Sequence, residues 1–267
     1  MRFVLQVLKE LIQNFHLVFS LASYDIKSKY RMHNLGIIWE IITPILKIMV
    51  YWFVFGIGIR QGAPINDIPY FVWLMAGLIP WLFISPAVIQ GCNSVYAKVN
   101  LVSKMKFPTS VLPGVSIISH FRNFLIMLVV LLVILLANGF SPGIYLLQLP
   151  YYLLCALAFL FSFTLLGSTI SIIFRDFQLI LQNAMRLIFF ITPIFWDPSH
   201  LPHSYQVLLK LNPFTYLIEG FRFTFLRQGW FYTDKLFGLY FWSTTLLILF
   251  IGSFIHLKFR SKFIDYL

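Results

Sequence analysis

Charged side chains are scarce in this sequence, and their scarcity excludes most soluble folds. Only 11% of the 267 residues are charged and 60% are hydrophobic, whereas soluble domains carry about 25% charged residues. We therefore expect an all-α integral membrane protein. The net charge of +11 comes from cations that lie beside apolar runs rather than on one polar face. Such cations are typical of topology determinants and lipid contacts, so we expect no nucleic-acid partner.

Motifs for catalysis and cofactor binding are also missing. The chain has no GxxxxGK[ST] loop, so it cannot bind ATP through a phosphate loop, and it has no HExxH. His200 and His203 flank a proline, which is a poor arrangement for metal ligands. Cys92 and Cys155 form no CxxC pair and lie in or near apolar runs, so we interpret them as packing residues. The few acidic residues are dispersed, and we expect no catalytic residue, metal or cofactor in this chain.

Long apolar stretches, in contrast, are abundant. A membrane span takes about 20 mostly apolar residues, and the sequence predicts six of them, Leu35–Ile59, Pro69–Gly91, Ser110–Ala137, Leu146–Phe174, Leu179–Trp196 and Leu236–Leu257. An even number of spans places both termini on one side. Lysine and arginine concentrate in the segments on that side, so we expect both termini to be cytoplasmic. No internal repeat or soluble segment is visible, and residues 1–267 are interpreted as one transmembrane domain.

Residues 1–31 are expected to lie along the membrane surface. Lys9 and Glu10 interrupt the apolar character of this segment, and it lacks the small-residue cleavage site of a signal peptide. Residues 1–23 instead predict an amphipathic interfacial helix, whose apolar stripe consists of Phe3, Val7, Leu11, Phe15 and Val18. A basic collar, formed by Lys27, Lys29 and Arg31, then precedes the first span.

Two connections are unusual. Between the second and third spans, residues 93–109 predict a short cytoplasmic helix with valines on one side and lysines on the other. Between the fifth and sixth spans, residues 197–235 are too apolar for a solvated loop. They hold two short apolar pieces, Ser204–Leu211 and Phe214–Leu226, split at a turn. We interpret this segment as an external re-entrant hairpin, in which Glu219 and Arg222 have the spacing of a helical ion pair.

Charges inside the spans are few, and such charges are functional candidates because they are costly in lipid. They are Glu40, Lys47, Arg122 and Arg186. An ion pair near the cytoplasmic edge remains an alternative for Glu40. Proton-coupled transport usually needs a deep acidic residue, and the chain offers none beyond Glu40, which disfavours ion-driven transport.

Aromatic residues, at 19% of the chain, are the main surplus. They favour a substrate path lined by aromatic rings, on which the apolar faces of sugars stack. The alternative interpretation is an interfacial aromatic belt together with rings that face the lipid. The candidate path residues are Tyr51, Trp52, Phe55, Trp73, Trp81, Phe189 and Trp196.

The order of several short motifs resembles one family of exporters. The motifs are Asp25-x-Lys27-x-Lys29-Tyr30-Arg31, Leu35-Gly36, Trp39, Pro44, Lys104-x-Lys106-Phe107-Pro108, Arg175-Asp176-Phe177, Thr192-Pro193-Ile194-Phe195-Trp196, Asn212-Pro213 and Arg222. This order is similar to that of ABC exporter permeases for cell-surface polysaccharides, which handle O-antigen, capsule or wall teichoic acid. The teichoic acid permeases look most similar. His33-Asn34 and Trp196 depart from the pattern and leave the substrate open.

The resemblance implies a homodimer of permease chains with two separate ABC ATPase chains, which would bind ATP and magnesium, in a bacterial plasma membrane. The chain would have no catalytic residue of its own but would belong to an ATP-hydrolysing translocase. Its substrate would be an undecaprenyl-pyrophosphate-linked polymer, with wall teichoic acid as the expected one. The first and fifth spans of two copies would line the channel.

The resemblance also implies residue roles. Residues for ATPase coupling are Val95, Lys98, Val99, Lys104, Lys106 and Phe107. Residues for the substrate headgroup or a gate are Lys27, Lys29, Tyr30, Arg31 and Glu40. The external hairpin, with Pro213, Glu219 and Arg222, would narrow the outer mouth of the channel.

Two other classes of function remain open. An ABC permease for drugs or small lipids could share the fold without a wide aromatic path. A non-transport scaffold or a membrane-bound glycosyltransferase is the second alternative. A glycosyltransferase needs carboxylates near a sugar-nucleotide site, and Asp25 and Asp176 stand alone in the sequence.

Overall fold

Helices make up nearly all of the described chain. The computed structural model describes residues 2–30, 35–59, 64–65, 67–98, 108–174 and 176–263. The side chains outside this description include those of Lys29, Tyr30, Ile37, Glu40, Ile59 and Lys262. Within the described part, the only strand-like pairing is an isolated bridge between Ile65 and Ile68. The predicted all-α class is therefore confirmed.

Five helical stretches are long and apolar enough to cross a membrane, which defines a multi-pass membrane protein. Each overlaps one of the predicted spans. They contain α3 (Trp39–Tyr51) with its π-helical continuation η2 (Trp52–Ile59), α4 (Tyr70–Cys92), η3 (Thr109–Val111) with α7 (Leu112–Ala137), η4 (Gly143–Gln148) with α8 (Leu149–Ile173), and α12 (Lys235–Phe259).

The fifth predicted span is shorter than expected. Helix α9 covers Phe177–Ile191, and its 15 residues rise about 22 Å, less than the hydrocarbon core of about 30 Å. The prediction extended this helix to Trp196, but Thr192 is already extended, with a ψ of 134°. Pro193 explains the difference, because proline disfavours the helical conformation in the residue before it. We call residues 192–196 the post-α9 segment.

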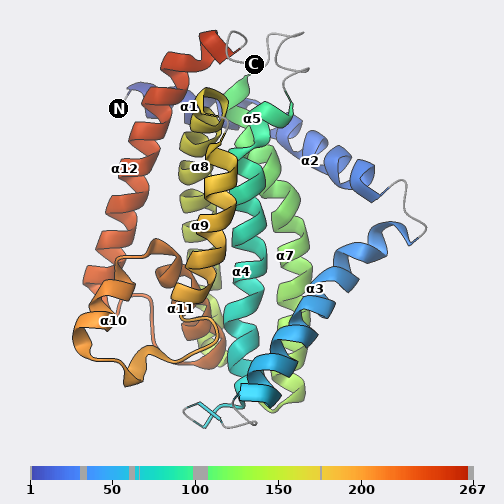
Figure 1. Cartoon of the computed structure of the whole chain (residues 1–267), viewed down its shortest axis with the longest axis vertical. Helices are drawn as coiled ribbons and strands as arrows, with labels where there is room; N and C mark the ends of the chain where they lie inside the picture. The colour runs from blue at the N-terminus through green and yellow to red at the C-terminus, as the bar shows by residue number, and fades with distance from the viewer. Residues whose placement is uncertain are drawn as a thin grey trace.

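Helices α4 and α8 form the centre of the bundle. Within the apolar stretches, 78% of α4 is buried but only 11% of α3 with η2. Figure 1 shows α3 leaning away from the bundle where the helix begins and approaching the bundle toward its other end, while α4, α7, α8 and α9 run side by side. The apolar outer surface of α3 is therefore left to lipid or to another chain.

The first described residues and the C-terminal end of α12 lie at one end of the bundle, called here the terminal end (Figure 1). The N-terminal segment is helical, as predicted, but it forms two helices, α1 (Arg2–Gln13) and α2 (Phe15–Tyr30). They meet at Asn14, whose side-chain amide donates to the Glu10 carbonyl at 2.8 Å. The predicted apolar stripe is therefore not buried as one continuous face. Its members Val7 and Val18 are buried, whereas Phe3 and Phe15 are 40% and 56% exposed.

Helix α1 is held at the terminal end by one carboxylate. Ser110 donates to Glu10 at 2.5 Å, and Arg260, just after α12, donates to it at 2.8 Å. Burial alone raises the pKa of Glu10, but these two partners outweigh it and leave the pKa below its ordinary value. Glu10 thus joins α1 to the beginning of α7 and the end of α12.

We expect the docking of α1 to weaken in acid. A folded-state pKa below 4.5 means that the charged carboxylate stabilises the docked helix above pH 4.5, and that this contribution disappears as pH falls through the folded pKa. Hydrogen exchange of the α1 amides, corrected for intrinsic rates, should stay constant from pH 8 to about 6 and rise below about 4.5. Glu10→Gln should raise the exchange rate of the α1 amides at neutral pH, whereas Lys9→Gln, on the exposed face of the helix, should leave that rate unchanged. Equal protection in both variants would contradict this.

The opposite end carries the α10–α11 hairpin, formed by α10 (His203–Lys210) and α11 (Pro213–Leu226), with η5 (Pro198–His200) before it (Figure 1). Asn212 caps α11, because its side-chain oxygen accepts from the Phe214 amide at 3.1 Å. The two short helices and the turn at Asn212-Pro213 match the sequence prediction. We call this the hairpin end.

Candidate functional site

A groove of about 420 Å³ opens between α3, α4 and α9. Helix α4 lies between the other two (Figure 1) and forms the floor, while α3 and α9 form the walls. The lining combines aromatic, aliphatic and polar side chains, namely Lys47, Tyr51, Trp81, Leu82, Ser85, Pro86, Ile89, Gln182, Met185, Arg186 and Phe189. A polar, aromatic-lined surface in the membrane part of the bundle is a candidate substrate path.

An aromatic cluster bounds the groove on the side of the hairpin end; it consists of Tyr51, Phe55, Trp81, Phe189 and Phe195. Phe189 is its centre, with ring centroids 5.5 Å from Trp81, 5.4 Å from Tyr51 and 4.6 Å from Phe195. Phe55 stacks on Phe195 with centroids 4.3 Å apart. Since each such ring pair contributes about 0.5–1.5 kcal/mol, the cluster links α3 and α4 to the end of α9.

The floor of the groove has hydrogen-bonding capacity of its own. Pro86 lies inside α4 and has no N–H, so the Leu82 carbonyl lacks its usual helical donor. Gln178 ties α9 to α4 by donating to the Ile89 carbonyl at 3.0 Å. Ser85 and Gln182 line the groove beside these positions. Hydroxyl-rich ligands would find both donors and acceptors here.

The post-α9 segment is held by Arg222 of α11. Arg222 is 3% exposed, and its guanidinium donates to the carbonyls of Pro193 and Ile194, the latter at 2.7 Å. It also stacks 3.5 Å from the ring centre of Trp73. Gly77 makes room for it, because a Cβ at that position would lie 2.5 Å from the guanidinium. Non-helical backbone in an apolar bundle needs such donors, since no helical N–H reaches its carbonyls.

Two further side chains fix the same segment. Tyr70 donates to the Phe195 carbonyl at 2.8 Å, and the Asn212 amide donates to the Thr192 hydroxyl at 3.0 Å. The segment that carries Phe195 of the aromatic cluster is therefore positioned by the beginning of α4 and by the α10–α11 hairpin. These contacts connect the hairpin to the groove.

The expected ion pair between Glu219 and Arg222 does not form. Arg222 bonds backbone carbonyls instead, and Glu219 lies beside a second cavity of about 730 Å³ at the hairpin end, which Trp73 and Arg222 also line. Burial raises the pKa of Glu219 to about 7, and the nearby Arg222 cation opposes this rise. Pro213 starts α11.

At the terminal end, the residues expected to couple to an ATPase are partly described. Helix α5 covers Ser94–Ala97, and Val95 is fully buried with Leu112, Ile172 and Phe263, so its side chain packs inward. Lys98 forms an ion pair with Asp25 of α2 at 2.6 Å, and Lys27 is exposed. Arg31, Val99, Lys104, Lys106, Phe107 and Arg175 lie outside the described residues, as do the side chains of Lys29, Tyr30 and Glu40.

A small polar cavity of about 250 Å³ lies next to this ion pair, between α2, α4, α5 and α7. Most of its lining is uncharged and polar, including Gln90, Asn93, Ser116 and Asn123. The Ser94 hydroxyl and the Asn123 side-chain oxygen are buried there without a hydrogen-bond partner. Such atoms are normally satisfied by water or a ligand.

The predicted path residues divide among different places. Tyr51, Trp81 and Phe189 line the groove, and Phe55 joins them in the aromatic cluster. Trp73 lies in the hairpin-end cavity. Trp52 packs edge-to-face on Phe71 at 5.6 Å, and Trp196 donates to the Phe190 carbonyl at 3.1 Å.

The sequence singled out Lys47 and Arg186 as costly intramembrane charges but did not place them in the path. Ser85 and Gln182 are not among the predicted site residues, and no sequence signal marks them, because single polar residues in apolar runs are common. Among the described residues, no three His, Cys, Asp or Glu side chains come together as a metal site.

Comparison with known proteins agrees with this architecture. Residues 16–226 match the family model described as ABC-2 type transporter. The chain therefore belongs to the ABC-2 type transporter family.

Among the relatives of this chain is the O-antigen export system permease protein RfbA of Myxococcus xanthus, which is 30% identical over 84% of this chain and 86% of its own. A protein of the same name from Klebsiella pneumoniae is 27% identical, over 92% and 93%. The polysialic acid transport protein KpsM of Escherichia coli is 21% identical, over 73% and 75%.

Proposed function

We propose that this chain is the permease subunit of an ATP-driven exporter that moves a lipid-linked cell-surface polysaccharide out of the cytoplasm. The observation that carries the proposal is the groove between α3, α4 and α9. Three aromatic rings and four polar side chains line it within the apolar bundle. Aromatic rings accept the apolar faces of sugars, while the polar groups bind hydroxyls. The printed names of the relatives, which are export permeases for O-antigen and polysialic acid, support the same substrate class.

The polymer is proposed to be attached to undecaprenyl pyrophosphate, with wall teichoic acid as one candidate. Lys27, the described member of the basic collar, lies in the second half of α2, as does Asp25, whose ion pair with Lys98 borders the polar cavity. Cations and uncharged polar groups suit a pyrophosphate sugar headgroup. We therefore propose that the headgroup is received at the terminal end.

Two permease chains are proposed to act together with two separate ATPase chains. The apolar outer face of α3 supports a partner there, because only 11% of its apolar stretch is buried within one chain. The ATPases would dock at the terminal end, around α5 and the cationic residues that follow it. The excess of lysine and arginine at that end supports a cytoplasmic location for both termini, and the α10–α11 hairpin would then narrow the outer mouth.

We expect Tyr51→Ala to lower ATP-dependent polymer export about three- to tenfold, because one stacking ring of the groove is lost. Export is measured as surface polymer in cells that carry the variant with its ATPase. Phe250→Ala is the matched control, since Phe250 is 47% exposed on α12, away from the groove. Unchanged export by a normally expressed Tyr51→Ala chain contradicts the proposed path. Loss of drug resistance with intact surface polymer favours the small-molecule exporter instead.

A further inference from the structure

The groove contains two cations that face the same space from opposite walls. Lys47 comes from α3 and Arg186 from α9, and both line the groove with the three rings. Among the described side chains, which do not include that of Glu40, no aspartate or glutamate lines the groove. The described lining therefore carries a charge of +2 without a balancing carboxylate.

Four other cations of the described chain have partner groups in the protein. Lys98, Lys210 and Arg260 each form an ion pair with a carboxylate, and Arg222 bonds two backbone carbonyls. In the same described part, neither Lys47 nor Arg186 has a carboxylate within ion-pair distance. Because a cation at membrane depth is costly unless it is paired or hydrated, this groove needs water or an anionic ligand.

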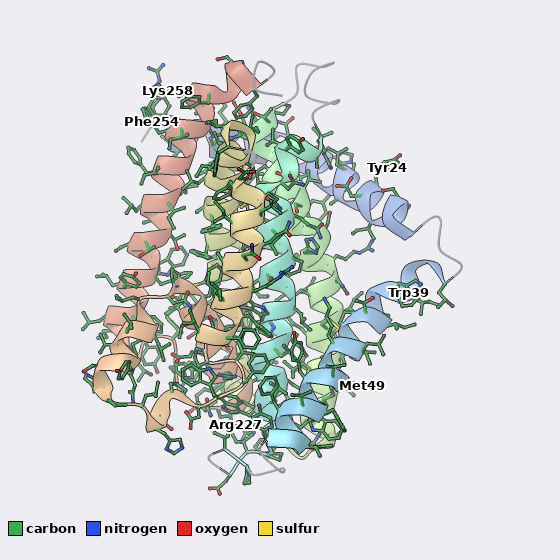
Figure 2. All side chains as sticks on the ribbon, viewed as in Figure 1. Tyr24, Trp39, Met49, Arg227, Phe254 and Lys258 are labelled. Carbon is green, nitrogen blue, oxygen red and sulfur yellow. The ribbon has the colours of Figure 1, made fainter. Side chains whose placement is uncertain are left out.

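The position of the cations argues against a lipid headgroup as that ligand. Headgroups lie at the edges of the hydrocarbon core, whereas Lys47 lies inside the apolar stretch Ile41–Gly58 and Arg186 in the second half of α9 (Phe177–Ile191). Figure 2 shows that Met49, two residues beyond Lys47, is well along α3 from Trp39 toward the hairpin end. A ligand that passes through the bundle reaches this depth.

We infer that the polymer carried by this groove is anionic, and that Lys47 and Arg186 bind phosphate or carboxylate groups repeated along it. This inference rests on the proposed function and names its substrate class. An arginine fork binds such oxyanions through two parallel hydrogen bonds, and a lysine adds a mobile point charge. Tyr51, Trp81 and Phe189 line the same groove, where they would contact the sugar rings between the charged groups. A neutral glycan would leave both cations unpaired.

The test measures binding to the full chain in nanodiscs of zwitterionic lipid. The probes are a labelled oligosaccharide of carboxylate-bearing sugars, a phosphate-bearing one and a neutral glucose oligosaccharide of equal length. We expect the two acidic probes to bind at least tenfold more tightly than the neutral one, and added salt to reduce the difference. Equal affinity for all three probes overturns the inference.

Variants locate the effect. Lys47→Met with Arg186→Met should weaken binding of the acidic probes about tenfold or more and leave the neutral probe unchanged. Lys47→Arg with Arg186→Lys should retain most of the binding. Lys258→Met is the control, because Lys258 lies on α12 near the terminal end (Figure 2) and lines neither the groove nor the two cavities described above. An equal loss in the control, or no loss in the double methionine variant, overturns the inference.

A second arm separates polymer from lipid. If anionic phospholipid in the nanodisc abolishes acidic-probe binding in proportion to its content, the cations serve lipid and the inference fails. Export from vesicles with the ATPase separates the inference from the proposed function. Equal export of acidic and neutral polymers leaves the proposed function standing and overturns the anionic preference. No export of any polymer, while ATP is hydrolysed, overturns both.

Discussion

Arg222→Met is expected to lower the free energy of unfolding by about 2–4 kcal/mol and to abolish most export. The substitution leaves the buried carbonyls of Pro193 and Ile194 without donors, each at a cost of about 1–3 kcal/mol. It also removes the stacking of the guanidinium on Trp73, a contact of about 2 kcal/mol when desolvated. Relief of the cost of burying the cation offsets part of this sum. The post-α9 segment would then lose its anchor, and Phe195 its place in the aromatic cluster.

The measurement is unfolding of the full chain in detergent, followed by tryptophan fluorescence, together with surface polymer in cells. Arg222→Lys retains the charge but not the two-pronged geometry, so it should recover little of the loss. Arg227→Met is the matched control, since Arg227 is exposed at the end of α11 and its replacement should change stability by less than about 0.5 kcal/mol. Wild-type stability in Arg222→Lys would show that the fork geometry is unimportant.

Gly220→Ala is expected to destabilise the chain by about 1–3 kcal/mol or more, although alanine is the better helix former. A Cβ at Gly220 would lie 2.0 Å from a ring carbon of Tyr152, and that ring is buried between α8 and α11 with little room to move. Helix α11 would have to separate from α8, which displaces the hairpin and with it Arg222. The unfolding midpoint in detergent is the measurement.

A double-mutant cycle tests this contact. Tyr152→Ala creates space, so the Gly220→Ala/Tyr152→Ala pair should be less destabilised than the sum of the single variants. Gly58→Ala is the control, because the nearest atom to its new Cβ is 3.6 Å away, an ordinary contact. Additive effects at Gly220 and Tyr152 would contradict the close packing of α11 on α8.

The periodicity and composition of the sequence predicted well the structural features that depend on one segment alone. Five spans and both helices of the α10–α11 hairpin lie within a few residues of their predicted bounds, because a long apolar run has no other stable state in lipid. The breaks inside helices were less predictable. The end of α9 follows from a local signal, Pro193, which the predicted bounds of the fifth span do not take into account. The interruption at Asn14, in contrast, depends on a side chain that competes for the Glu10 carbonyl.

The candidate site shows the same division. Its residue types could be read from the sequence, since Tyr51, Trp81 and Phe189 belong to the aromatic surplus and Lys47 and Arg186 to the few intramembrane charges. Their meeting in one groove could not be read, because it depends on α3, α4 and α9 packing at residues far apart in the chain. The partner of Arg222 is a similar case: spacing favoured Glu219 on the same helix, but the carbonyls of the post-α9 segment lie closer.

By itself, the sequence determined that this is a helical multi-pass membrane protein without an ATP-binding loop, and it supplied the cations on which the proposed orientation rests. These properties follow from composition and from local runs of apolar or cationic residues, because each segment's free energy of transfer from water to lipid depends on its own residues. Only the tertiary structure decided which aromatic and charged residues share a groove and how the hairpin is tied to it. Those contacts join residues tens to hundreds of positions apart, and their energies depend on packing and hydrogen-bond geometry that no single segment contains.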